Sequence, residues 1–534
     1  MLIDARQVEK NSQHPVDICI IGAGTAGITI ALEFNRTNFQ ICLLESGEFL
    51  PNRATQSLSK GEVIGEPYSL QDSRSRQFGG TTNLWGGVCL PLDEIDFEER
   101  TWLPHSGWPF SREHLVPYYQ RSQKVLGLAD YQFYNLADWQ ASLPQSISSI
   151  HREKVISQTF QFNRKRRRFG EVYREEIVNS LNISLYTYAN AIDIELSKNR
   201  ETAKSVKVAC LNGNYFHVSA QYIVLAAGGI ENVRLLLASN DEQSIGNENG
   251  LIGRFFMEHS YRTPGYIIPN KSRIDNLSLY ADSFVIEDAY DEARVSGMLS
   301  LKENILRSEK LMSIKARLFR SVETEQAPSV QSYKKIKDTL SKQRLPEDPL
   351  KALNEIVKDM PQLIQHFNWA IANRVSALRT RGDNHYVVVG VEHQPHSDNQ
   401  VTLSPQRDCL GQRRAKLTFS PTESDEKSYQ RCIEILRDSL EAEKIGKVVF
   451  QTDRNFTPYY INYPYGSHHM GTTRMHEDPN LGVVDRNCRM HSISNLFITG
   501  SSVFPTGGSA NPTLTIVTLA IRLSDRLKRL LKDK

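Results

Sequence analysis

The chain has 534 residues and a mass of 60.8 kDa, more than one hydrophobic core usually covers, which excludes a small binding module. With 40% hydrophobic and 23% charged residues, its composition is globular and excludes collagen-like, disordered and disulfide-scaffold classes. The 64 Lys and Arg nearly balance the 61 Asp and Glu, so the net charge of +3 predicts neither nucleic acid nor an anionic membrane as partner. We therefore expect a small-molecule substrate.

Cysteine spacing and hydropathy indicate the compartment. The seven cysteines form no C-x-x-C pair, so we expect neither a metal site nor a disulfide framework. The N-terminus lacks the apolar segment of a signal peptide, and no apolar run approaches the roughly 20 residues that cross a bilayer. We expect a soluble, cytoplasmic protein with no transmembrane segment.

The first elements in chain order form a βαβ unit. The apolar run Val16–Ile21 stops at a glycine and predicts a buried parallel strand. A helix over Thr25–Phe34 and a second strand over Gln40–Leu44 follow. Two more strands are predicted at Ile183–Tyr188 and Tyr222–Ala227, so the parallel sheet resumes after a long excursion.

Residues 260–450 have a different pattern. Polar and apolar residues alternate as in strands at His385–Val391 and Val401–Leu403, and helical periodicity at Leu353–Val375 is interrupted by Pro361. This region is predicted to be a second, mixed α/β part. The chain then ends in a helix whose apolar stripe the main body must cover. The stripe consists of Leu519, Leu523, Leu527 and Leu530.

A G-x-G-x-x-G motif lies at the first strand-to-helix junction. Gly22 permits the tight turn, Gly24 lets the backbone approach a pyrophosphate, and Gly27 allows close helix packing. Glu45, at the end of the next strand, is placed to accept hydrogen bonds from a ribose diol, and the helix N-terminus favours the anion. Because strand, helix and acid are all present, we predict a dinucleotide site.

This motif alone does not distinguish NAD from FAD, because both cofactors contain the adenosine diphosphate part that the motif binds. No second fingerprint for NAD(P)H occurs in mid-chain, so a bound flavin takes its electrons from the substrate. The segment Phe78–Gly87 combines glycines with small hydroxyl residues and suits a loop whose amides face an isoalloxazine ring or a pyrophosphate. A plain turn explains that segment equally well.

The segment Ser467–Met475 offers a general base. It contains His468 and His469, which point to opposite faces of an extended chain. A structural core or surface role is the alternative for each histidine. Further on, Asn511 and Pro512 predict the start of a helix whose amides would face a negative partner such as a reduced flavin, with simple capping as the alternative.

Together these segments resemble the glucose-methanol-choline (GMC) family of flavin oxidoreductases. The resemblance spans nearly the whole chain, because the matching segments occur in the family's order: VDICIIGAGTAGITIALE with Glu45, FGGTTNLWGGVCLPLDEIDF with SGWPF, YIVLAAGGIENVRLLLAS, GLIGRFFMEH, and the block from HHMGTTRM to NPTLT. The H-x-x-G-T spacing is similar to the segment with the family's catalytic histidine and implies that role for His468. Asn511 matches the Asn version of the second active-site position. That version, with GGTTNLWGG and SGWPF, is most similar to the pyranose-oxidase-like and sugar-dehydrogenase-like branch.

The resemblance implies an α/β fold in which a Rossmann-like FAD-binding domain is interleaved with an α+β substrate-binding domain containing a mixed or antiparallel sheet. Residues 1–100 and 181–260 are expected to form the N-terminal and middle segments of the FAD domain. Residues 101–180 are expected to form a cap segment of the substrate domain, and residues 261–455 the substrate domain itself. Residues 456–534 then complete the FAD domain and the active site.

The resemblance also implies the site residues. His468 and Asn511 are the catalytic pair, and His393 and His469 are weaker candidates for the substrate pocket. Leu84 stands where pyranose oxidases carry a histidine tethered to FAD, so we expect non-covalent FAD. The residues expected at the cofactor are Gly22, Gly24, Thr25, Ala26, Gly27, Glu45, Ser46, Gly79, Gly80, Thr81, Asn83, Leu84, Trp85, Gly86, Gly87, Ala191, Ala227, Gly228, Gly500, Ser501, Pro512 and Thr513.

The implied reaction is oxidation of a CH–OH group of a sugar, aminosugar or cyclic polyol, including a glycosylated metabolite. His468 accepts the hydroxyl proton, Asn511 holds the same oxygen, and hydride passes to flavin N5. The alternatives are an FAD-dependent dehydrogenase of apolar alcohols, a catalytically silent FAD-binding subunit and, less favoured, a nicotinamide-dependent dehydrogenase. The sequence leaves open the electron acceptor, whether oxygen, a quinone or a cytochrome, and the oligomeric state.

Overall fold

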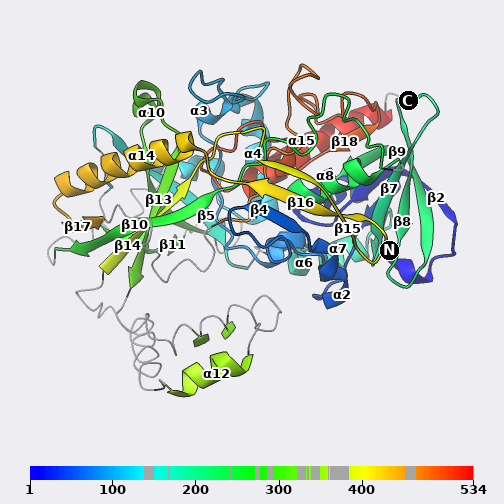
Figure 1. The fold of residues 1–534 in the computed structure, drawn as a ribbon, viewed down its shortest axis with the longest axis horizontal. Coiled ribbons are helices and arrows are strands. Elements are labelled where there is room, and N and C mark those ends of the chain that lie inside the picture. Colours follow the sequence, from blue (N-terminus) through cyan, green and yellow to red (C-terminus); the bar gives the residue numbers. More distant parts are fainter. Residues whose placement is uncertain are drawn as a thin grey trace.

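The described residues form three β-sheets with helices packed on them, a mixed α/β architecture. The computed structural model describes residues 1–137, 149–150, 152–165, 168–240, 242–270, 277–285, 293–321, 332–333, 336–337, 349–358, 360, 384–450 and 465–532. A largely parallel sheet and an antiparallel sheet lie side by side along the long axis of the molecule (Figure 1).

Strands from both ends and the middle of the chain build the eight-stranded sheet. Its order is β1 (Leu2–Asp4), β6 (Ile183–Thr187), β3 (Ile41–Leu44), β2 (Gln13–Ile21), β9 (Tyr215–Leu225), β8 (Ala203–Ala209) and β7 (Asn190–Leu196), with β18 (Leu496–Ile498) beside β9. Strands β1, β6, β3, β2, β9 and β18 run parallel, whereas β8 pairs antiparallel with β9 and with β7. The carboxyl ends of β2, β3, β9 and β18 therefore meet at one edge, where open α/β sheets bind ligands.

Helices pack beside this sheet. Helix α1 (Thr25–Phe34) and helix α4 (Arg112–Leu126) both contact α15 (Thr513–Lys532), and α8 (Gly228–Ala238) follows β9. The apolar stripe predicted for the last helix is buried or half-buried in these contacts. It consists of Leu519, Leu523, Leu527 and Leu530. The final helix is thus held by earlier parts of the chain, as its pattern requires.

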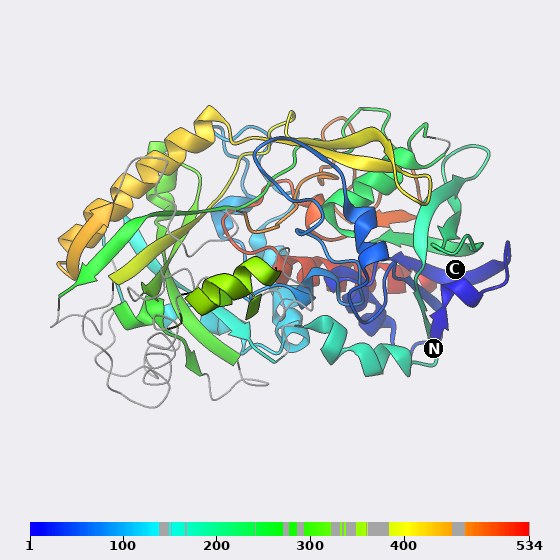
Figure 2. The ribbon, with the colours of Figure 1, turned by 60° about the horizontal axis from the view of Figure 1, so that its bottom comes forward.

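The seven-stranded sheet is antiparallel throughout. Its order is β11 (Phe284–Val285), β12 (Ala293–Leu301), β13 (Ile314–Ser321), β14 (Asn384–Val391), β10 (Ser260–Pro269) and β17 (Gly446–Phe450), with β5 (Val155–Asn163) also on β12. Helix α14 (Glu423–Ala442) lies along this sheet in both views and buries its apolar side in a second core (Figures 1 and 2).

The remaining elements are short. The third sheet pairs β15 (Gln400–Arg407) with β16 (Arg413–Phe419) and β16 with β4 (Glu62–Gly65). The short helices are α2 (Arg53–Gln56), α3 (Glu94–Phe97), α6 (Phe169–Val172), α7 (Arg174–Val178), α9 (Ser278–Ala281), α10 (Glu303–Glu309) and α12 (Pro349–Lys358). None of the helices in the described ranges has the length and apolarity that crossing a membrane requires.

The predicted fold class is confirmed, and the predicted elements in the described ranges are present. The helix predicted from Thr25 begins and ends where expected. Strand β9 begins at Tyr215, before the predicted Tyr222, because β8 extends its pairing beyond the apolar run. Of the helix predicted at Leu353–Val375, α12 accounts for the part up to Lys358, and residues 361–375 lie outside the described residues.

A buried ion pair ties the segment after α3 to the antiparallel sheet. The side chains of Arg100 and Glu392 are both fully buried, and the guanidinium donates twice to the carboxylate, once with an Nη1–Oε2 distance of 3.1 Å. Glu392 also accepts from the backbone N–H and the hydroxyl of Ser313. Removing either charge would leave the other buried and unpaired.

Arg100→Met should therefore lower the free energy of unfolding by about 3 to 5 kcal/mol. Lys427→Met removes an exposed pair with Glu423 and, as the matched control, should change it by less than about 1 kcal/mol. Urea unfolding followed by tryptophan fluorescence measures both changes. Equal losses in the two variants would contradict this account.

Candidate active site

A cavity of about 620 Å³ opens at the carboxyl edge of the parallel sheet and extends to the antiparallel sheet. Its size is typical of cofactor and ligand sites. Tyr261 of β10 and Arg317 of β13 line its second side. Its first side includes residues that directly follow β2, β3, β9 and β18 or lie within two residues of them: Gly22, Glu45, Ala226 and Gly500.

Bare backbone forms much of the cavity wall. Gly22 has a φ of +103°, and a Cβ there would lie 2.8 Å from the Ala226 carbonyl oxygen. A Cβ on Gly27 would lie 1.9 Å from the Gly22 carbonyl oxygen, so this glycine lets α1 approach the turn. Four cavity-lining glycines would place a Cβ with no atom within 4 Å: Gly24, Gly86, Gly228 and Gly500.

Glu45 fixes the glycine turn from inside the protein. Its Oε2 accepts from the Ala23 N–H at 3.1 Å, and its Oε1 accepts from the Gly47 N–H at 2.9 Å. Burial raises the pKa of this carboxyl, against the lowering effect of these hydrogen bonds and of Arg76. The acid is therefore held at the cavity wall by the protein's own backbone.

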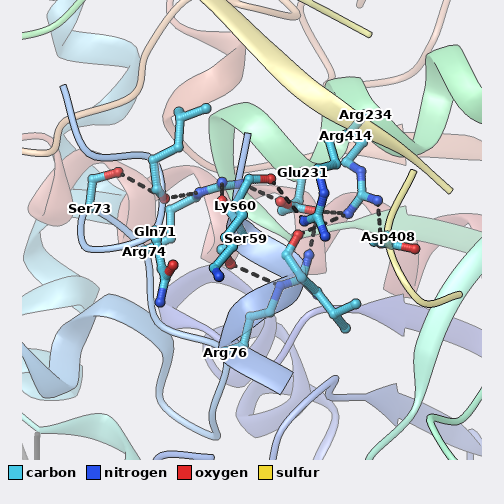
Figure 3. A network of polar contacts seen from close by, with 12 residues as sticks. Ser59, Lys60, Gln71, Ser73, Arg74, Arg76, Glu231, Arg234, Asp408 and Arg414 are labelled. Carbon is cyan, nitrogen blue, oxygen red and sulfur yellow. Dashed lines mark hydrogen bonds and ion pairs between the residues drawn. The ribbon is translucent and has the colours of Figure 1, made fainter. Parts of the chain in front are cut away.

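A network of buried and half-buried charges lies at the cavity wall (Figure 3), and its Arg76 is the cation that lowers the pKa of Glu45. Glu231 on α8 accepts from Arg74 and, at 2.6 Å, from Arg76, while Arg234 pairs with Asp408. Burial alone would raise the pKa of Glu231, but Arg76, Arg74 and Arg234 lower it to about 2. These five side chains line the cavity with a net positive charge, which suits an anionic group near the glycine turn.

The second glycine segment is both a turn and a part of the wall. Gly79 has a φ of +94° and packs on Gly170, and Asn83 donates from Nδ2 to the Phe78 carbonyl oxygen at 2.9 Å. The following residues line the cavity: Gly80, Thr81, Thr82, Leu84, Trp85, Gly86, Gly87 and Val88.

The hydrogen bonds of two histidines determine their tautomers. His259 Nε2 lies 2.7 Å from the Gly508 carbonyl oxygen, which only accepts, so the neutral ring carries its proton on Nε2. Its Nδ1 then accepts from His468 Nδ1, 2.9 Å away, and this leaves a lone pair on His468 Nε2. Burial lowers the pKa of His259 to about 4, and burial with His259 and His469 holds the pKa of His468 well below its ordinary value. His468 is therefore neutral at pH 7 and able to accept a proton.

Asn511 lies next to that lone pair. Its Nδ2 is 3.5 Å from His468 Nε2 and donates to the Tyr261 hydroxyl at 3.2 Å. Asn511 precedes α15, which begins at Thr513, one residue later than the start predicted at Pro512. Asn511, His468 and Tyr261 all line the cavity. A hydroxyl group placed there would meet an acceptor on His468 and a donor on Asn511 together.

Glu258 holds both histidines from behind. Its Oε1 accepts from the backbone N–H of His468 at 2.7 Å and of His259 at 2.8 Å, and its Oε2 accepts from the Tyr68 hydroxyl at 2.6 Å. The same hydroxyl contacts His469 Nε2 at 2.7 Å. Burial raises the pKa of Glu258 to about 7, so this fully buried acid changes charge near neutral pH.

Most residues that the sequence singled out line the cavity. Every residue expected at the cofactor does so except Gly27, Gly79 and Asn83, which shape the turns behind it. His469 lines the cavity but bonds to Tyr68 rather than facing Asn511, as alternation along the chain predicts.

His393, a weaker candidate for the substrate pocket, does not line this cavity. The buried ring contacts Ser260 Oγ through Nε2 at 2.9 Å, and its Nδ1 lies 3.7 Å from the Asp425 carboxylate. These contacts join β14 to the start of β10 and of α14, so the residue is structural.

Sequence reasoning missed the residues behind the catalytic pair. Glu258 and His259 lie in GLIGRFFMEH, a segment used for the resemblance without a role for its last two residues. An acid and a histidine directly before a strand were the available signal. The arginines of the charged network gave no such signal, because charged residues usually lie on the surface.

The last part of the chain matches a known protein family. The family model described as GMC oxidoreductase matches residues 395–520. The 2-methyl-1,2-propanediol dehydrogenase of Mycolicibacterium austroafricanum is 22% identical, covering 98% of this chain and 97% of its own. The 6'''-hydroxyparomomycin C oxidase of Streptomyces lividus is also 22% identical, covering 95% of this chain and 90% of its own.

Solved structures share the fold. Pyridoxine 4-oxidase from Mesorbium loti superposes with a TM-score of 0.56 at 17% identity, covering 96% of this chain and 99% of its own. A variant of the Aspergillus oryzae RIB40 formate oxidase gives a TM-score of 0.57 at 16% identity, covering 98% of this chain and 100% of its own. The fold is thus that of an FAD-binding, Rossmann-like domain combined with a substrate-binding domain. Residues 395–520 thus carry the GMC oxidoreductase domain, and the chain is an FAD-dependent oxidoreductase similar over nearly its whole length to enzymes that act on alcohols.

The residues present fit FAD. Four glycines leave a cradle of bare backbone, and two cavity-lining residues, Asn190 and Ser509, each have a buried side-chain oxygen without a hydrogen-bond partner. The glycine turn and Glu45 would hold the adenosine diphosphate part. Residues 80–88 and the start of α15 would hold the remainder.

Gly24→Val should keep the flavin-free fold but prevent FAD binding, because the added side chain meets no protein atom and enters the cavity. Gly27→Ala is a smaller change, yet it should lower the stability of the flavin-free protein by about 1 to 3 kcal/mol, because its Cβ clashes with backbone. Flavin absorbance per protein and thermal unfolding of the flavin-free variants separate the two effects. Full flavin content in Gly24→Val would contradict the placement of FAD against the backbone at Gly24.

The rate of flavin reduction by an alcohol should rise with pH through a midpoint near 7 as Glu258 loses its proton, since a carboxylate behind His468 favours the protonated imidazole. Burial raises the pKa of Tyr68 and lowers those of His259, His468 and His469, so none of these neighbours titrates there.

Glu258→Gln should remove that midpoint and slow reduction by about 10-fold or more. Anaerobic rapid mixing between pH 6 and 8 gives the profile of each protein. A wild-type rate that does not change over this range would exclude the effect.

Proposed function

We propose that the enzyme oxidises a CH–OH group of a sugar, aminosugar or cyclic polyol, including a glycosylated metabolite, with His468 as general base and Asn511 as the residue that holds the reacting oxygen. The observation that carries the proposal is the unprotonated Nε2 of His468, which lies 3.5 Å from Asn511 Nδ2 inside the cavity.

Each residue has a defined task in this reaction. His468 takes the hydroxyl proton on Nε2, and the cation that forms is stabilised through its Nδ1–H bond to His259. Asn511 donates to the same oxygen, so two contacts orient the C–H bond that breaks. Bound FAD supplies the hydride acceptor.

Several observations favour a hydroxylated substrate over an apolar alcohol. The side of the cavity formed by the antiparallel sheet carries the polar groups of Tyr261, Lys315 and Arg317. The apolar residues on that side include Met298 and Phe319. Among the relatives, one is named for a diol and one for a hydroxyparomomycin, so both names contain a substrate with hydroxyl groups. A catalytically silent subunit has no need for the paired His468 and Asn511.

Two further features belong to the proposal. FAD is held non-covalently, supported by Leu84, a cavity-lining hydrocarbon side chain that forms no bond to a flavin. The protein works in the cytoplasm, supported by seven cysteines that are all free thiols in the described residues. The flavin is reoxidised by oxygen, a quinone or a cytochrome, and oxygen addition after anaerobic reduction separates the first from the others.

His468→Ala should slow anaerobic flavin reduction by about 10² to 10⁴ with an accepted alcohol, because the proton then has no acceptor at the reacting oxygen. A screen of sugars, aminosugars, polyols and aliphatic alcohols for loss of the flavin absorbance band identifies that alcohol. His217→Ala, on β9 and outside the cavity lining, is the matched control and should reduce at the wild-type rate. Unchanged kinetics in His468→Ala would remove it from the role of base.

A further inference from the structure

The antiparallel sheet turns one face toward the catalytic pair. Tyr261 of β10, Gly390 of β14 and Lys315 of β13 lie in one row across three strands. Arg317 lies two residues further along β13, so its side chain is on the same face as Lys315. All four residues line the cavity, and Tyr261 binds Asn511. Arg317 is therefore a neighbour of the place where the reacting hydroxyl is held.

The two cations of β13 differ in their partners. Lys315 Nζ pairs with the Asp93 carboxylate at 2.5 Å and also donates to Gln158, so its charge is balanced. Arg317 has no carboxylate or other hydrogen-bond acceptor among the described residues, and its Nε is buried without a partner. Phe160 and Phe319 flank the guanidinium at 4.4 and 5.0 Å from their ring centres.

The positive charge of the Arg317 guanidinium has no negatively charged partner among the described residues. Aromatic rings stabilise a cation over their faces, but they offer no acceptor in the guanidinium plane, where its N–H groups point. Burial lowers the pKa of Arg317 to about 10, which keeps it charged at pH 7. Buried cations are normally paired, and the other cavity-lining arginines are. A ligand that enters the cavity would therefore meet an unpaired guanidinium at Arg317.

We propose that the substrate is a sugar acid, and that Arg317 binds its carboxylate while His468 and Asn511 hold the hydroxyl that is oxidised. This inference rests on the proposed function and narrows its substrate class. A guanidinium matches the two oxygens of a carboxylate. A single unpaired positive charge is balanced by one carboxylate, whereas a phosphate monoester would bring excess negative charge, and the ammonium of an aminosugar would be repelled.

Matched substrate pairs test this assignment in the FAD-loaded enzyme. Anaerobic flavin reduction is measured with gluconate against glucitol and with glucuronate against glucose, each pair differing at the carboxylate. In the wild-type enzyme, the acid should reduce the flavin at least about 10-fold more efficiently than its neutral partner does. Arg317→Met, which keeps an unbranched side chain beside the two rings, should lose about 10- to 100-fold in apparent affinity for the acid and so lose the preference for the acid over its neutral partner. Arg317→Lys should restore part of the loss.

A binding measurement and a control complete the test. Acetate, titrated against the flavin spectrum, should bind competitively with the alcohol to wild type and not to Arg317→Met. Arg294→Met, on β12 and outside the cavity lining, should behave as wild type in every assay. These readouts report on the anion site even without turnover.

The outcomes separate this inference from the proposed function. Reduction by neutral partners as fast as by acids, an Arg317→Met defect shared equally by both, or a preference for glucose 6-phosphate over glucuronate would overturn the carboxylate site and leave alcohol oxidation standing. If no alcohol of either kind bleaches the flavin, the proposed function fails, and acetate binding that depends on Arg317 would still support the anion site.

Discussion

The parallel pairing of β18 with β9 is the contact on which the site depends. It brings residues 499–503 to the same sheet edge as the glycine turn. Backbone hydrogen bonds then join Gly471, Thr473 and Met475 to residues 501–503, and Met470 exchanges two bonds of 3.0 Å with Met257, directly before Glu258. This series of backbone hydrogen bonds fixes His468 against both the parallel sheet and the first residues of the antiparallel sheet.

Within that frame, burial determines the chemistry of the polar groups. The histidines are neutral because water is excluded, and a neutral His259 bonded to a carbonyl leaves only one tautomer for His468. Glu258 satisfies the backbone donors of both histidines, so their positions do not depend on a bound ligand. The base is therefore oriented before a substrate arrives, which reduces the reorganisation that the reaction requires.

Sequence reasoning was strongest where a local pattern has one physical explanation. The strand, the helix from Thr25 and the roles of Gly22 and Gly24 followed from hydropathy and steric rules that act within a few residues. It was weakest where a side chain meets a distant partner. Nothing near His393 in the chain indicated that Ser260 and Asp425 would hold it outside the cavity, and nothing near Glu258 indicated that it would join both histidines.

The sequence by itself determined the α/β class, the dinucleotide motif, the GMC resemblance and the candidate pair of His468 and Asn511, because each is encoded in spacing along the chain. Only the tertiary structure decided which nitrogen of His468 is unprotonated, that Glu258 changes charge near neutral pH, and that Lys315 is paired with a carboxylate while Arg317 is not. These properties depend on burial and on charges contributed from remote segments. Two cations two residues apart are alike in sequence, and only the arrangement of the fold around them makes one structural and the other available to a ligand.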